Sequence, residues 1–161
     1  MSARILFLCT GNRARSQMAE GLARAMAAPG VEVASAGTKP NPKGVHPLAV
    51  EMLREKGIDA RAHRSKHLDE LAGEFDYVIT LCDSAAQACP NYPARRARLH
   101  WGLPDPDLAG GDPVRERAMF VEIRDEIERR LREWLGKEGL LNVAAGLPRQ
   151  RNSGSGGIGP P

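Results

Sequence analysis

The chain has few aromatic residues and no long apolar run. Phe, Trp and Tyr make up 4% of its 161 residues. No stretch approaches the roughly 18 consecutive apolar residues of a membrane-spanning helix, so we expect a soluble protein without a membrane partner. The N-terminal residues lack the longer apolar stretch and the small-residue cleavage site of a secretory signal, which predicts a cytoplasmic protein.

Cysteine is also scarce, with three in the whole chain: Cys9, Cys82 and Cys89. In a cytoplasmic protein this number argues against a structural disulfide framework and favours catalytic, redox or metal-binding roles. A tetrahedral zinc site would need further cysteine or histidine ligands at suitable spacing. The four histidines share no such spacing, so no metal site is expected; His46 and His67 are interpreted as surface residues.

A strong excess of one charge is missing as well. The formal net charge is +3, and all 20 acidic residues precede residue 140 together with 21 of the 23 Lys and Arg residues. The part of the chain before residue 140 therefore carries a charge of about +1, which argues against a nucleic-acid partner.

Short apolar runs alternate with helix-period stretches along the chain. Strands are expected at residues 5–8, 31–36, 75–81 and 98–101, and helices at 16–28, 46–56 and from the Asp112-Pro113 pair to near Gly136. This alternation predicts an α/β fold: a small doubly wound four-stranded parallel sheet with helices on both faces. The functional site should lie beyond the carboxyl ends of the strands.

A change in composition near residue 142 suggests a domain boundary. Residues 1–141 are expected to form the single domain. From Asn142 onward the chain is rich in Gly, Ser and Pro and has no apolar period. We therefore predict that residues 142–161 form a disordered tail.

The residues between the first strand and the first helix favour an anion site. They read CTGNRARS, from Cys9 to Ser16. Backbone N–H groups at such a turn converge on one concavity, and the helix dipole adds positive charge there. Gly11 is expected to supply the tight-turn conformation, and Arg15 can bind two oxygens of an oxyanion. The predicted oxyanion-binding set is Thr10, Gly11, Asn12, Arg13, Ala14, Arg15 and Ser16.

Cys9 stands at the rim of this predicted concavity. Electropositive settings at a helix N-terminus favour the reactive thiolate, and the Ser16 hydroxyl could donate a hydrogen bond to the sulfur. Cys9 is thus the candidate nucleophile. The alternative is a small buried side chain that ends a strand.

Cys82 and Cys89 follow the third predicted strand, at a spacing too wide for a CxxC redox motif. Their sulfurs could still meet if the segment between them is flexible. Two structural thiols remain the alternative.

The segment CTGNRARSQMAEG resembles the loop of the low-molecular-weight phosphotyrosine phosphatase superfamily, and most closely its thioredoxin-coupled arsenate reductase branch. The resemblance extends from about residue 4 to residue 135. Phosphatases of this superfamily usually carry a second cysteine just before the arginine, where this chain has Ala14. Members also keep an aspartate followed by proline on a late loop, and HWGLPDP places Asp105 in that role as the acid that protonates the leaving oxygen. The alternative for Asp105 is a solvated turn.

The resemblance implies a relay of three thiols without a cofactor. Cys9 attacks arsenate held by the loop and Arg15, Cys82 then attacks Cys9, and Cys89 attacks Cys82. Thioredoxin reduces the resulting disulfide, which makes arsenate (with phosphate as its analogue) and thioredoxin the expected partners of a monomeric enzyme in arsenic detoxification.

The same resemblance bears on potassium. Some reductases of this branch bind a potassium ion through residues matching Asn12, Glu20 and Ser35, and through an acidic residue at the position of Lys66. We therefore expect the Lys66 ammonium to replace the cation here. The alternative is a solvated surface lysine.

Two other functions fit the loop. The first is a low-molecular-weight protein tyrosine phosphatase that forms a phosphocysteine at Cys9, and a weak phosphatase side activity is expected in any case. Such phosphatases usually have aromatic residues beside the acid, whereas Asp107 and Leu108 follow here. The second is a thiol-based oxyanion or redox sensor, although no output domain is visible.

Overall fold

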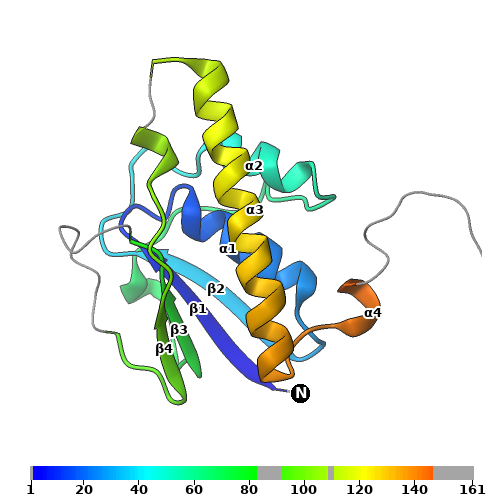
Figure 1. Ribbon diagram of the computed structural model, residues 1–161. Helices are drawn as coiled ribbons and strands as arrows, with labels where there is room; N and C mark the ends of the chain where they lie inside the picture. Colours follow the sequence, from blue (N-terminus) through cyan, green and yellow to red (C-terminus); the bar gives the residue numbers. More distant parts are fainter. Residues whose placement is uncertain (1, 83–91, 109–110, 147–161) are drawn as a thin grey trace, which may run out of the picture.

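Four parallel strands form the centre of the computed structural model, which describes residues 2–82, 92–108 and 111–146. The strands are β1 (Ala3–Cys9), β2 (Val31–Gly37), β3 (Tyr77–Thr80) and β4 (Ala97–His100). Their spatial order is β2-β1-β3-β4, and every neighbouring pair is parallel (Figure 1). The chain thus starts inside the sheet, moves to one edge and crosses back to the other, which confirms the predicted α/β class.

β1 is buried on both faces. Ile5 and Phe7 belong to the larger apolar core, whereas Leu6 and Leu8 belong to a second core on the opposite face. A strand that is covered on both sides needs apolar residues at every position, which explains the continuous run at residues 5–8.

Helical segments cover the two faces unequally. α1 (Arg15–Met26) and the long α3 (Pro113–Glu138) contribute to the core that contains Ile5 and Phe7, and α2 (Pro47–Arg54) packs against both helices. Figure 1 shows α3, in yellow, running beside α1. The short 3-10 helix η1 (Leu68–Glu70) contributes Leu68 to the core on the other face.

The ends of α3 follow from its sequence. The Asp112 carboxylate accepts hydrogen bonds from the N–H groups of Val114 (3.0 Å) and Arg115 (3.4 Å), and proline is the first helical residue. The predicted stop near Gly136 was slightly early. Gly139, at a φ of 74°, ends the helix in the left-handed conformation.

The described residues continue past residue 141, where the domain was predicted to end. The Asn142 N–H donates to the Met26 carbonyl (2.8 Å), Leu141 forms a bridge with Ala27, and α4 (Val143–Gly146) follows. Leu140, which is buried, anchors this segment on the core and places these backbone groups within reach of the end of α1. Residues 147–161 of the predicted tail lie outside the described residues. Within the described part, no helix is long and apolar enough to cross a membrane.

Candidate active site

The segment from Cys9 to Ser16 lies at the carboxyl end of β1, as predicted. Cys9 is the last residue of β1 and Arg15 is the first residue of α1. Cys9 is free and 2% exposed, and its Sγ lies 2.9 Å from Ser16 Oγ. Ser16 Oγ already accepts a hydrogen bond from Asn12 Nδ2 (2.8 Å), so its own proton can point to the sulfur. A hydrogen bond of this kind stabilises negative charge on Cys9 Sγ.

Asn12, rather than Gly11, takes the left-handed conformation in this loop, with a φ of 48°. Gly11, which was expected to supply the tight-turn conformation, does not have a positive φ. Asparagine is among the few residues that tolerate this region, and here its buried amide is fully engaged. Its Nδ2 donates to Ser16 and to Ser35 (2.9 Å), while its Oδ1 accepts from Gln17 Nε2 and from the Lys66 N–H (both 3.0 Å).

The surrounding chain holds the carbonyl groups of the loop. The carbonyls of residues 10–13 each accept a hydrogen bond at 2.6–3.0 Å, and their donors are, in chain order, Lys39 N, Asn41 N, Ser65 Oγ and His46 N. No peptide bond is cis in the described residues. In a trans peptide the C=O and the following N–H point in opposite directions, so the N–H groups of residues 11–14 turn away from these donors. This orientation agrees with the predicted nest of backbone N–H groups, whose binding of an anion stays a prediction.

Arg15 and Asp105 come together beside the loop. The Arg15 side chain is 3% exposed, and its Nη1 donates to the carbonyls of Leu81 (3.2 Å) and Leu103 (2.9 Å). Its Nη2 lies 3.6 Å from Asp105 Oδ2. Leu81 follows β3 and Leu103 follows β4, so the carboxyl ends of three strands meet at this guanidinium.

The side chains of Arg13 and Thr10 have contrasting surroundings in the loop. The Arg13 side chain turns away from the nest, because its Nε donates to Asp107 (2.8 Å) and its Nη1 to the Gly44 carbonyl (2.9 Å). Only its backbone can serve the nest. Thr10 Oγ1 is the one buried side-chain oxygen or nitrogen in the described part of the chain that has no hydrogen-bond partner.

Cys82 directly follows Leu81 and is fully buried. It is disulfide-bonded, in contrast to Cys9. The Leu81 N–H donates to the Leu8 carbonyl (2.8 Å), which fixes the chain next to Cys82 beside the end of β1. Cys89 falls among residues 83–91, outside the described residues, so its predicted position is not tested.

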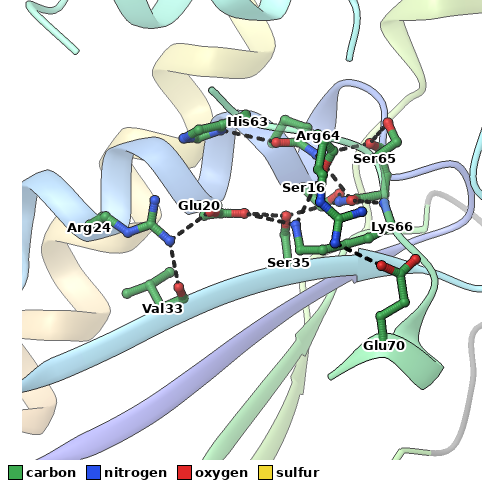
Figure 2. Close-up of polar contacts among 12 residues, drawn as sticks. Ser16, Glu20, Arg24, Val33, Ser35, His63, Arg64, Ser65, Lys66 and Glu70 are labelled. Atoms are coloured by element: carbon green, nitrogen blue, oxygen red, sulfur yellow. Dashed lines mark hydrogen bonds and ion pairs between the residues drawn. The ribbon is translucent and has the colours of Figure 1, made fainter. Parts of the chain in front are cut away.

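A polar network lies behind the loop (Figure 2). Glu20, with a side chain 7% exposed, accepts hydrogen bonds from Ser35 (2.5 Å) and Arg24 (2.7 Å). Lys66 Nζ lies 3.8 Å from Glu20 Oε1, and burial lowers the pKa of Lys66 from its ordinary value. Two cationic side chains already balance the Glu20 carboxylate, so the site does not fit a bound potassium ion.

Sequence reasoning missed one cluster near the loop. His46 is buried rather than at the surface, and it lies with Asp107 and Glu116 in a group whose donor atoms are within 4.8 Å of one another. These residues come from three separate segments, so no local spacing could reveal the group.

Comparison with known sequences places this arrangement in context. The family model described as low molecular weight phosphotyrosine protein phosphatase matches residues 4–144. An arsenate reductase of Halalkalibacterium halodurans is 43% identical over 129 residues, which cover 80% of this chain and 91% of the relative. An arsenate reductase of Bacillus subtilis is 43% identical over 131 residues, which cover 81% and 93%.

Solved structures agree with the sequence comparison. An arsenate reductase in the phosphate-binding state superposes with a TM-score of 0.69 at 28% identity, covering 85% of this chain and 98% of that one. The thioredoxin-dependent arsenate reductase of Corynebacterium glutamicum gives a TM-score of 0.62 at 33% identity, covering 84% and 61%.

Proposed function

The chain belongs to the low molecular weight phosphotyrosine protein phosphatase family, and we propose that it is a cytoplasmic arsenate reductase that uses thioredoxin. The observation that carries the proposal is its 43% identity to arsenate reductases over four-fifths of the chain, together with a free Cys9 in the nest. The scarcity of aromatic residues beside Asp105 gives a phosphotyrosine ring little to stack on.

Binding and the first bond come from the loop. The N–H groups of residues 11–14 and the Arg15 guanidinium hold three arsenate oxygens, and the unpaired Thr10 hydroxyl is available to an oxygen as well. Cys9 Sγ attacks arsenic and forms a sulfur–arsenic bond. Asp105, which lies beside Arg15, gives its proton to the departing oxygen, which leaves as water. Arsenic is still As(V) at this stage.

The two electrons come from a pair of thiols. The Cys82 thiolate attacks Cys9 Sγ, the sulfur–arsenic bond breaks with its electron pair on arsenic, and arsenite, As(III), leaves. A Cys9–Cys82 disulfide remains. Cys89 then attacks Cys82, which releases the Cys9 thiolate and forms a Cys82–Cys89 disulfide. In support, Cys82 is disulfide-bonded while Cys9 is free.

Reduction of the last disulfide closes the cycle. Thioredoxin, with a reduction potential of about −270 mV, reduces this disulfide by dithiol exchange. Each of the three cysteine sulfurs makes one nucleophilic attack in this cycle, so no further cofactor is required. The enzyme acts as a monomer on an anion in solution.

The test measures NADPH oxidation that depends on arsenate reduction. Arsenate, thioredoxin, thioredoxin reductase and NADPH are mixed with the protein, and absorbance at 340 nm is followed for the wild type, Cys82→Ser and Cys89→Ser. We expect arsenate-dependent turnover in the wild type and its loss in both variants. Cys9→Ser should abolish every activity.

A parallel assay with p-nitrophenyl phosphate separates the alternative. A low-molecular-weight phosphatase would hydrolyse this ester through a Cys9 phosphocysteine and would not need Cys82 or Cys89. Equal hydrolysis by the wild type and both serine variants, without arsenate turnover, would replace the reductase proposal by a phosphatase. Slow hydrolysis beside rapid arsenate turnover fits the expected side activity.

A further inference from the structure

An ionic cluster joins the loop that carries Asp105 to the Cys9 loop. It consists of Arg13, His46, Asp107 and Glu116. Arg13 belongs to the Cys9 loop, His46 precedes α2, Asp107 lies in the 3-10 helix η2 (Pro106–Leu108), and Glu116 is in the first turn of α3. Arg13 and His46 contact the Asp107 carboxylate, and Glu116 joins the cluster through His46.

The Arg13–Asp107 ion pair is the shortest of the ionic contacts in this cluster. Arg13 Nε lies 2.8 Å from Asp107 Oδ2, and the two side chains are 13% and 29% exposed. Arg13 Nη1 also donates to the Gly44 carbonyl, so the guanidinium is held in one orientation. Partial burial and two directed hydrogen bonds distinguish this pair from an exposed ion pair, which contributes little.

His46 supports the other oxygen of Asp107. Its Nδ1 accepts a hydrogen bond from the Leu48 N–H (3.0 Å), so in the neutral ring the proton resides on Nε2. That nitrogen lies 3.3 Å from Asp107 Oδ1 and 3.5 Å from Glu116 Oε2. The ring also packs on Phe120 at a centroid distance of 4.6 Å, which fixes its plane.

Three members of this cluster, His46, Asp107 and Glu116, are residue types that also bind metal ions. Their hydrogen bonds and ion pairs argue against a metal here. A metal on His46 Nε2 would require the proton to move to Nδ1, where the Leu48 N–H already donates. Asp107 in addition forms an ion pair with the Arg13 guanidinium, whose positive charge would repel a metal cation. The cluster is therefore saturated by its own hydrogen-bond donors.

The cluster is linked to the Asp105 carboxylate through the backbone of Asp107. The Asp107 backbone N–H donates to Asp105 Oδ1 (3.0 Å), while Asp105 Oδ2 faces Arg15. Fixing the Asp107 side chain fixes its backbone, and through that N–H it fixes the orientation of Asp105.

We propose that Arg13 and Asp107 form a positioning pair that holds Asp105 in place for proton donation to the leaving oxygen. The side chains of the pair act through Asp105 and do not touch the substrate. This inference rests on the proposed function, in which Asp105 is the general acid. A misplacement of about 1 Å at a catalytic group costs up to roughly 100-fold in rate, so loss of the pair should lower kcat with little change in oxyanion binding.

The experiment is an epistasis test in the thioredoxin-coupled assay with the full chain. Asp107→Asn should lower kcat for arsenate at least 10-fold, and Arg13→Gln should do the same. The KM for arsenate and the inhibition constant for phosphate should stay within about twofold of the wild type. In an Asp105→Asn background, Asp107→Asn should cause no further loss, because the group that it positions is already gone.

A matched control comes from an ion pair away from the loop. Lys56 Nζ and Glu128 Oε1 lie 2.9 Å apart, with side chains 35% and 21% exposed. Glu128→Gln removes a similar contact and should leave kcat unchanged. Arg13→Lys keeps the charge and should recover part of the rate lost in Arg13→Gln. Circular dichroism and thermal melts verify that each variant is folded.

The outcomes separate this inference from the proposed function. Equal additional losses from Asp107→Asn with and without Asp105 would overturn the positioning role, as would a rise in KM at constant kcat. If the wild type reduces no arsenate but hydrolyses phosphate esters, the proposed function fails, and the same epistasis measured with phenyl phosphate decides the role of the pair. If the wild type is inactive on both substrates, Asp105 is not a general acid, and the positioning role of Arg13 and Asp107 is refuted as well.

Discussion

Replacing Gly37 by alanine would place a methyl group against the backbone of the candidate oxyanion loop. Gly37 is the last residue of β2 and pairs with Cys9 across the sheet. A Cβ at this position would lie 2.4 Å from the Thr10 carbonyl oxygen, 3.0 Å from the Asn12 nitrogen and 3.1 Å from the Cys9 carbonyl oxygen. All three neighbours are backbone atoms, which cannot swing aside as a flexible side chain can.

The size of the effect follows from these distances. Ordinary contact begins near 3.4 Å, so the Thr10 carbonyl would have to move by about 1 Å. Overpacking of this kind costs about 1–3 kcal/mol of unfolding free energy. The same shift moves the N–H group that follows the Thr10 carbonyl, and a 1 Å misplacement in a reacting site can cost roughly 100-fold in rate. Gly37→Ala should therefore lower both the unfolding free energy and the rate of the molecules that remain folded, the rate by up to roughly 100-fold.

Three measurements test this prediction. Urea unfolding gives the stability, the coupled assay gives kcat/KM for arsenate, and protection of Cys9 from iodoacetamide by phosphate gives oxyanion affinity. Gly136→Ala in α3 is the control, since its Cβ would meet only Leu141 Cδ2 at 4.0 Å. That change should raise stability by roughly 0.5–1 kcal/mol and leave activity unaltered. If Gly37→Ala keeps wild-type affinity and rate, the loop is not rigid and the reasoning is wrong.

Three further predictions concern the polar groups around the loop. Exchanging sodium for potassium should not change the wild-type rate, whereas Lys66→Ala should make the rate potassium-dependent; a several-fold response of the wild type would contradict the assignment of Lys66. Burial lowers the pKa of His63 below 6.5, so as the pH falls His63 is protonated in the unfolded chain before it is protonated in the folded protein, and the free energy of unfolding decreases below pH 6.5. His63→Gln should make this decrease smaller, as measured by urea unfolding between pH 7.5 and 5. Ser16→Ala should slow alkylation of Cys9 by iodoacetamide several-fold at pH 7, because the sulfur loses its hydrogen-bond donor; an unchanged rate would show that this bond does not activate Cys9.

The strands and the convergence of the site could be predicted from the sequence, because both follow from general rules. The apolar run at residues 5–8 reflects a strand buried on both faces. Arg15 and Asp105 are 90 residues apart in the chain, but each follows a parallel strand at its carboxyl end, and those ends share one edge of the sheet. Their proximity at 3.6 Å agrees with that rule.

Features that depend on long-range contacts could not be predicted. Asn12 takes the left-handed position because Ser35 and Lys66, which are distant in sequence, bind its amide together with the nearby Gln17. Local propensity alone favours the neighbouring Gly11 for that conformation. The burial of His46 likewise depends on Phe120 in α3. In both cases the partner is set by how the elements pack, which no local pattern contains.

The hydrogen bonds to the loop carbonyls have a consequence for selectivity. Because internal hydrogen bonds set the conformation of the loop before an anion binds, the loop can adjust little to the size of the anion. Arsenate and phosphate share charge and tetrahedral shape, so such a loop will admit both, and cellular phosphate will compete for it continually. Discrimination must then arise after capture, from the ease with which an arsenic centre accepts two electrons from sulfur and a phosphorus centre does not.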